Sequence, residues 1–198
     1  MAQMMSADPN WLAGSHSRKQ TAAAIWVGSM GLLVLGLQPI LLGAMFTQGL
    51  VDFDGLALIA TLEIIAIAIG SVLGGALGTK GGLRWKSITL LLVLAALNLA
   101  MAYADGLGSL IGLRMAAGLC EGGLVMIAIE LIARARHAER LGGLFVTTQT
   151  LAQSALALAL ALWVVPRWGA AGGFAAMGVV CILSVAVALQ LADGYADM

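Results

Sequence analysis

Long apolar runs separated by short polar segments are the feature that most constrains the fold of this chain. Of its 198 residues, 61% are hydrophobic and only 10% are charged, whereas a soluble domain has about 45–50% apolar and about 25% charged residues. A soluble fold of this length could not bury so much apolar surface. Because a helix crosses a bilayer with about 20 apolar residues, and barrel strands give a much weaker alternation, the runs predict an all-α integral membrane protein.

Six of the runs are long enough to cross a bilayer as helices. They cover residues 22–46, 56–77, 88–104, 109–133, 142–165 and 170–192. Residues 1–21 and 193–198 are polar, and we expect them to form two tails. The first run holds about 25 residues, more than the 7–15 apolar residues of a signal peptide, so we expect it to remain as a span.

Basic residues gather on one side of the predicted membrane. Arg167 is the basic residue of the opposite side, and Arg114 lies inside the fourth run. Because cytoplasmic segments carry an excess of Lys and Arg, this pattern predicts cytoplasmic termini and a location in the cell inner membrane. The eight basic residues of the cytoplasmic segments are Arg18, Lys19, Lys80, Arg84, Lys86, Arg134, Arg136 and Arg140. The formal net charge of zero disfavours a nucleic-acid partner.

Four ionisable residues fall inside the predicted spans: Glu63, Arg114, Glu121 and Glu130. A central charged residue costs about 2.5–3.5 kcal/mol on insertion scales, so such groups face a bundle interior or a watery cavity. With a rise of about 1.5 Å per residue, Arg114 lies roughly 8 Å below the outer end of its span and Glu63 roughly 10 Å below the end of its own. Gln38 falls in the same outer layer of the first span.

Arg114 and Glu121 are seven residues apart and therefore share one face of their helix. An arginine offers a two-pronged contact to a carboxylate or phosphate, and a buried carboxyl group can exchange a proton. We therefore predict that Arg114 anchors an anionic solute and that Glu121 and Glu63 couple its movement to protons. The alternative is an ion pair that only holds two helices together. The candidate solute-binding residues are Arg114, Gln38, Glu121, Gln149 and Gln153.

A glycine stripe runs along the second span, where Gly70, Gly74 and Gly78 repeat every fourth residue. Small residues at this spacing let two membrane helices approach closely. The loop that follows, residues 75–84, reads Gly-Ala-Leu-Gly-Thr-Lys-Gly-Gly-Leu-Arg. It resembles the signature between spans two and three of the major facilitator superfamily, roughly G-x-L-x-D-R-x-G-R-R. The matches are Gly75, Leu77, Lys80, Gly82 and Arg84, while Thr79 replaces the usual Asp and Leu83 a usual basic residue.

The fourth span continues the resemblance. The stretch from Arg114 to Gly118 is similar to that family's R-x-x-x-G, and Glu130 with Arg140 is similar to its acidic residue and R-G ending. The resemblance covers about residues 22–192 and implies the amino-terminal six-helix half of such a carrier. It also implies a gating contact at the cytoplasmic face, to which Glu130 can contribute through Arg134 or Arg140. The implied gating residues are Gly75, Lys80, Gly82, Arg84, Glu130 and Arg140.

Members of that family have twelve spans in two parallel halves. Since an even number of spans returns the chain to its starting side, two copies of this half can reproduce the arrangement as a homodimer. The resemblance implies a central cavity lined by the first and fourth spans. It also places the second span of one copy against the fifth span of the other, which predicts dimer contacts at Gly70, Gly74 and Gly78.

The function that follows is secondary active transport of a small anionic or amphipathic solute by alternating access. The alternatives are a non-transporting assembly module, one half of a heterodimeric carrier, or a fragment of a longer carrier. An enzyme is disfavoured because His16 and His137 lie in cytoplasmic segments, so no Ser–His pair falls within the membrane. The isolated Cys120 and Cys181 form no metal or disulfide pattern, and no nucleotide-binding fingerprint is present. We therefore expect no cofactor.

Overall fold

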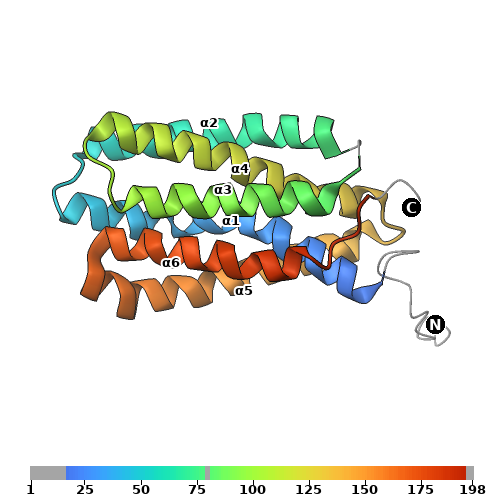
Figure 1. Ribbon diagram of the computed structural model, residues 1–198. Coiled ribbons are helices and arrows are strands. Elements are labelled where there is room, and N and C mark those ends of the chain that lie inside the picture. Colours follow the sequence, from blue (N-terminus) through green and yellow to red (C-terminus); the bar gives the residue numbers. More distant parts are fainter. Residues whose placement is uncertain (1–16, 79–80, 195–198) are drawn as a thin grey trace.

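The computed structural model describes residues 17–78 and 81–194, which form a bundle of long helices lying side by side (Figure 1). Four long helices come first: α1 (Arg18–Thr47), α2 (Phe53–Gly78), α3 (Leu83–Met101) and α4 (Leu107–Arg134). They are followed by α5 (Ala138–Ala159), a π-helical segment (Leu160–Val164) and α6 (Val165–Ala188). The described residues form no strand.

Within the described residues, five continuous helical stretches are long and apolar enough to cross a membrane, which is compatible with the predicted class of helical membrane bundle. The last stretch, Ala138–Ala188, has 51 residues and would be about 77 Å long if straight, against a hydrocarbon core of about 30 Å. It is not straight. Gly169 has non-helical backbone angles, with φ 64° and ψ −158°, and α5 and α6 lie side by side (Figure 1). The break lies between the predicted spans 142–165 and 170–192.

Local sequence explains where the first two helices begin. Ser17 caps α1, since its hydroxyl accepts from the Gln20 backbone N–H at 3.2 Å and its own N–H donates to the Gln20 amide at 2.9 Å. Asp52 caps the start of α2, since its carboxylate accepts from the Gly55 backbone N–H at 2.8 Å. These bonds satisfy backbone donors that have no partner inside a helix.

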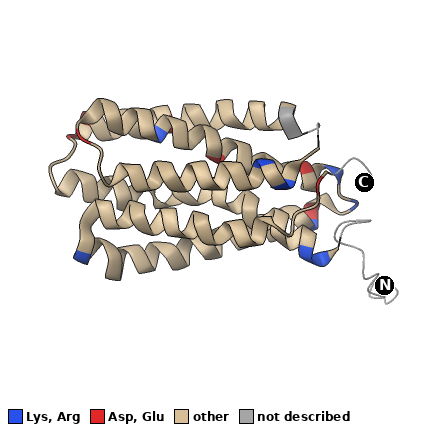
Figure 2. Ribbon diagram, in the orientation of Figure 1, with Lys and Arg blue, Asp and Glu red and all other residues tan. Residues whose placement is uncertain are grey.

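The charged residues lie mainly at the two ends of the bundle (Figure 2). The start of α1, the start of α3 and the end of α6 share one end, because Trp26 bonds to Ser184 and Arg84 bonds to Leu191. The described basic residues of this end are Arg18, Lys19, Arg84, Lys86, Arg134, Arg136 and Arg140. The opposite end carries Asp52, Asp54, Asp105 and Arg167. We call the first the basic end.

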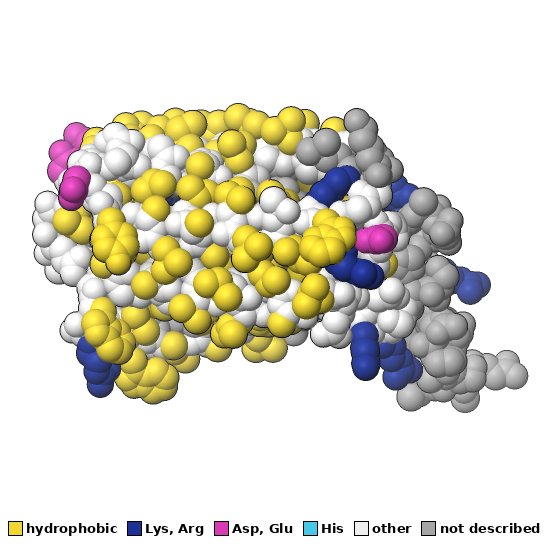
Figure 3. Space-filling model, in the orientation of Figure 1, with side chains coloured by type: hydrophobic (Ala, Val, Ile, Leu, Met, Phe, Trp, Pro, Cys, Tyr) yellow, Lys and Arg dark blue, Asp and Glu magenta, His cyan; other side chains and the backbone are white. Residues whose placement is uncertain are grey.

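Between the two ends the outer surface is apolar. Hydrophobic side chains are spread along the whole length of the face shown in Figure 3, between the charged ends. Val72 is 74% exposed, and Leu151 and Leu183 are each 67% exposed. Soluble monomers rarely expose contiguous apolar patches of this extent, whereas a lipid-facing surface requires them.

Glycines bring α2 and α4 into backbone contact. A Cβ added to Gly70 would lie 2.2 Å from the Leu119 carbonyl oxygen, and one added to Gly122 would lie 2.1 Å from the Ile67 oxygen. Gly74 likewise faces Gly123, with 2.9 Å between its added Cβ and the Gly123 Cα. This corrects the prediction that Gly70 and Gly74 contact a second copy, because α4 of the same chain already occupies that side of α2. The surroundings of Gly78 lie outside the described side chains.

Candidate functional site

Three ionisable side chains meet in the interior, and we call Glu63, Arg114 and Glu121 the ionic cluster. Arg114 Nη2 donates to Glu63 Oε1 across the α2–α4 contact and to Glu121 Oε1 within α4, the latter at 3.1 Å. The side chains are at most 2% exposed. One permanently charged guanidinium therefore faces two carboxyl groups in an environment nearly closed to water.

The sequence of α4 explains how the cluster forms. Arg114 and Glu121 lie two helical turns apart on one face. Gly118 lies between them on the same face, and a Cβ added there would be 2.7 Å from the Glu63 carbonyl oxygen. Because Gly118 has no side chain, the backbone of α2 comes close enough for the Glu63 carboxyl group to reach Arg114.

Two further helices complete the site. Gln38 of α1 donates from Nε2 to Glu63 Oε2 at 2.8 Å. The Phe174 ring of α6 lies under Arg114, with 5.6 Å between Cζ and the ring centroid, a distance at which a cation and a ring attract. The structure thus brings Gln38, Glu63 and Arg114 together, as their shared predicted depth indicated. Phe174 is a site residue that sequence reasoning missed, since one aromatic residue in an apolar run carries no distinguishing signal.

The cluster is not fully satisfied. Arg114 Nε and Glu121 Oε2 are buried without a hydrogen-bond partner in the described part of the chain, as is Asn98 Oδ1 on α3. A buried polar group left without a partner costs about 1–3 kcal/mol, and more if it is charged. Arg114 therefore keeps an unused donor at Nε, and Glu121 an unused acceptor at Oε2.

The watery cavity that we predicted around Arg114 and Glu121 is not found among the described residues, since both side chains are at most 2% exposed in this conformation. Grooves with volumes from about 360 to about 650 Å³ are found on the described residues, and other side chains line them. Arg114 and Glu121 neutralise each other within a single chain instead. The physical reason is the glycine contact, which brings Glu63 close enough to add a second carboxyl group. The alternative reading of these residues, an ion pair between helices, describes this conformation.

The glutamines of α5 serve a different contact. Gln153 Nε2 donates to the Leu32 and Leu33 carbonyl oxygens of α1, at 3.1 and 3.4 Å. Gly36 makes room for this amide, since its added Cβ would be 1.6 Å from Gln153 Nε2. Gln149 lies one turn earlier on α5 and is half-buried. That Gln153 contacts a solute stays a prediction; in this conformation its amide N–H group is bound to the backbone of α1.

Two of the predicted gating residues, Arg84 and Glu130, form side-chain contacts near the basic end. Arg84 donates from Nε and Nη2 to the Leu191 carbonyl oxygen, at 3.0 and 2.9 Å, and so binds the chain just after α6. Glu130 pairs with Arg134 at 2.7 Å within α4, one of the two pairings expected for it. A Cβ added to Gly75 would lie 3.2 Å from the Met126 methyl carbon, and Gly82 has a φ of 68°. Arg140 is exposed near the start of α5, and Lys80 lies outside the described residues.

No family model matches this chain, and no curated protein sequence matches it. The ionic cluster and the apolar exterior that surrounds it are therefore the features of this protein that indicate a function.

Proposed function

We propose that this protein is a half-size secondary transporter of the inner membrane, in which two copies enclose a pathway for a small anionic or amphipathic solute. The observation that carries the proposal is the ionic cluster inside an otherwise apolar bundle. Well-packed apolar residues often stabilise a protein as much as a buried ion pair or more. Ionisable groups inside membrane helices are therefore functional candidates by default.

The chemistry of the cluster suits coupled movement of a carboxylate and a proton in the same direction. Arg114 binds Glu121 with one nitrogen and leaves Nε unused. When the site opens, an anionic solute can therefore bind the guanidinium group through two parallel hydrogen bonds. The displaced carboxylate is then left in an apolar environment and takes up a proton. When the solute leaves, the carboxyl group releases the proton and returns to Arg114. Each cycle moves one anionic group together with one proton, with Glu121 and Glu63 as carriers of that proton.

The proposed topology has six crossings. It treats α5 and α6 as separate spans joined at Gly169, so that both ends of the chain lie on one side. The basic end faces the cytoplasm in this proposal, because its Lys and Arg residues favour retention there. The resemblance to the amino-terminal half of the major facilitator superfamily supports the same arrangement.

The proposed homodimer follows from the same number of spans, since two six-span copies supply the twelve spans of such a carrier. Because α2 and α5 lie at opposite margins of the bundle (Figure 1), a two-fold axis can place α2 of one copy against α5 of the other. Val72 of α2 and Val146 of α5 are 74% and 57% exposed, and each lies roughly 9–12 Å along its helix from the basic end.

Cysteine crosslinking tests this dimer. In a cysteine-free background, a chain carrying both Val72→Cys and Val146→Cys is expected to form a covalent dimer in membranes. Each single variant is the control and is expected to stay monomeric on a denaturing gel. Monomer alone from the double variant would contradict the proposed dimer.

Transport is tested in proteoliposomes that contain a pH-sensitive dye, using a panel of mono- and dicarboxylic acids. We expect at least one acid to drive proton movement that depends on the protein. Glu121→Gln should keep exchange of that acid while losing the associated proton, and Arg114→Lys should weaken its binding because the two-pronged contact is lost. Equal fluxes with and without the protein for every acid would contradict the proposal.

A second candidate is a non-transporting membrane module in which the cluster is only a clamp between helices. It is favoured by the burial and mutual neutralisation of the three side chains in this conformation. The two candidates differ in one outcome. If the cluster is only a clamp, neutral replacements change stability, and the unsubstituted protein shows no transport that a replacement could abolish.

A further inference from the structure

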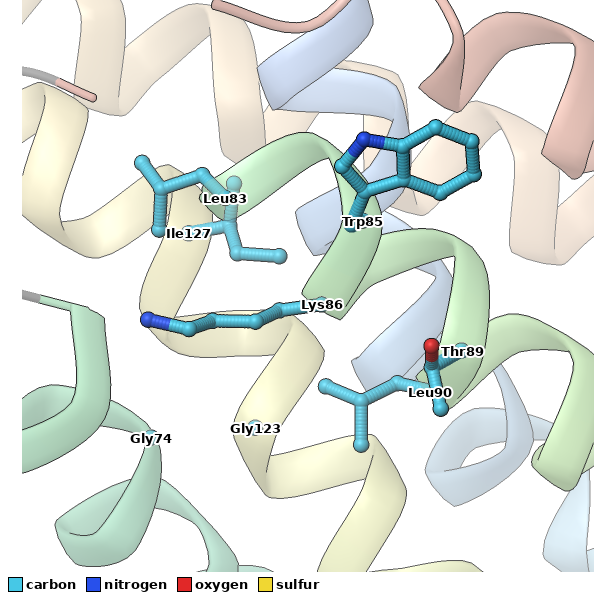
Figure 4. A pocket seen from close by; sticks show the side chains of 8 residues that line it. All are labelled: Gly74, Leu83, Trp85, Lys86, Thr89, Leu90, Gly123 and Ile127. Atoms are coloured by element: carbon cyan, nitrogen blue, oxygen red, sulfur yellow. The ribbon is translucent and has the colours of Figure 1, made fainter. Parts of the chain in front are cut away.

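A groove opens between α2, α3 and α4 near the basic end, about 360 Å³ in volume (Figure 4). It lies apart from the ionic cluster, and its walls are mostly apolar. Leu83 and Leu90 of α3 and Ile127 of α4 provide much of the lining.

Two glycines create this hollow. Gly74 of α2 and Gly123 of α4 both line the groove. A Cβ added to Gly123 would lie 3.0 Å from Leu90 Cδ1, so the missing side chain keeps the groove open at this point. The groove thus depends on the same small residues that bring α2 and α4 together.

One cation lies within the apolar lining. The Lys86 side chain extends from α3 across the groove (Figure 4). Its ammonium donates to the Gly81 carbonyl oxygen at 2.6 Å, which holds the positive charge at the end of the groove nearest the α2–α3 connection. Trp85 borders the groove and is 67% exposed.

This combination matches the chemistry of a lipid at a membrane interface. Tryptophan and lysine side chains favour the headgroup level, and a basic side chain there attracts anionic lipids. The apolar length of the groove lies on the membrane side of Lys86, toward Leu90 and Gly123. An occupant must therefore be negatively charged at one end and apolar along the rest.

We propose that this groove binds an anionic phospholipid of the leaflet at the basic end, with one acyl chain along α3 and α4 and the phosphate at Lys86. The proposal requires only that the chain lies in a membrane and does not depend on transport. Charge complementarity selects the lipid: the apolar walls suit any acyl chain, whereas Lys86 distinguishes an anionic headgroup from a zwitterionic one.

The test uses the fluorescence of Trp85 in a full-length chain that keeps this tryptophan and carries Phe at Trp11, Trp26, Trp163 and Trp168. The protein is reconstituted in bilayers containing increasing fractions of phosphatidylglycerol or phosphatidylcholine with brominated acyl chains, which quench a tryptophan they touch. We expect brominated phosphatidylglycerol to be preferred by about five-fold, the order expected of one basic side chain at an anionic surface.

Three variants assign the preference to Lys86. Lys86→Gln should bring phosphatidylglycerol to the level of phosphatidylcholine, and Lys86→Arg should retain the preference because it keeps the charge. Arg136→Gln is the matched control, since it removes an exposed charge from the same end away from the groove. For the protein that keeps Lys86, raising the salt concentration should also reduce the preference for phosphatidylglycerol. This measurement tests the role of the charge without changing Lys86.

Equal quenching by the two lipids before substitution would overturn the proposal, as would a preference that survives Lys86→Gln or high salt. Absence of quenching by both lipids would also overturn it, since it would show that protein, such as a second copy of the chain, covers the groove.

Discussion

The α2–α4 contact and the α1–α5 contact both attach a helix at the margin of the bundle, and they do so by different chemistry. α2 meets α4 backbone to backbone through Gly70, Gly118 and Gly122, with the ionic cluster beside that contact. α5 is tied to α1 by one amide, in which Gln153 donates to two carbonyl oxygens at 3.1 and 3.4 Å.

This difference indicates which side of the molecule can move. Moving α2 away from α4 would expose buried charges to lipid and break close backbone packing. Moving α5 away from α1 would break the amide contacts and the apolar packing around Leu141 and Phe145, and it would separate no charged pair. In the proposed transport cycle we therefore expect α5 to move relative to α1, while α2 and α4 hold the charged groups together.

The largest effect should come from removing the cation of the α2–α4 side. Arg114→Met leaves two buried carboxyl groups without their counter-charge, and breaking a buried pair in this way costs about 3–5 kcal/mol. Thermal unfolding in detergent should show a large fall in Tm. Arg134→Met, which removes an arginine of an exposed pair on the same helix, is the control and should leave Tm nearly unchanged. Similar losses for both variants would contradict the assigned importance of the cluster.

A slightly smaller loss is expected from Gly122→Leu, because a Cβ at this position would lie 2.1 Å from the Ile67 oxygen and 2.5 Å from the Ser71 nitrogen. Backbone cannot yield as a side chain does, so we expect a cost of about 3 kcal/mol. Gly112→Leu is the matched control on α4, since its added Cβ has no neighbour within 4 Å among the described residues. If both variants unfold at the same temperature, the close α2–α4 contact is not a major source of stability.

A modest effect is expected on the other side. Gln153→Leu removes the amide that ties α5 to α1, and one such hydrogen bond contributes about 0.5–1.5 kcal/mol. A spin label on α5 should gain mobility in this variant, whereas a label on α2 should not. Equal changes on both helices would remove the contrast between the two contacts.

The smallest effect is expected from Gly36→Ala. Its Cβ would meet only the end of the flexible Gln153 side chain, and Ala gains about 0.8–1.0 kcal/mol over Gly as a helix former. We therefore expect a net change within about 0.5 kcal/mol. In a double variant with Gln153→Ala, the atoms that clash with the added Cβ are absent, and the substitution at Gly36 should become stabilising. A large loss in the single variant would show that α1 and α5 are packed as rigidly as α2 and α4.

Some of the site could be predicted from the sequence because helix geometry is regular. The spacing of Arg114 and Glu121, and the depth shared by Glu63 and Gln38, follow from residue counts along apolar runs. The sequence did not reveal which helix the glycine stripe contacts, because a stripe of small residues indicates a close approach without naming its partner. For the same reason Arg114 was expected to face a cavity, whereas Gly118 lets Glu63 neutralise it within the chain.

Replacing the whole ionic cluster at once tests whether these three side chains carry proton-coupled transport. A chain with Glu63→Gln, Arg114→Met and Glu121→Gln retains the volume of the three side chains and leaves no buried charge there, so it should unfold close to the temperature of the unsubstituted protein. Proton-coupled uptake should be measured with the acid that the unsubstituted protein moves fastest. If the ionic cluster carries transport, this variant should fold and lose proton-coupled uptake. A folded variant that still transports at the original rate would contradict that role of the cluster.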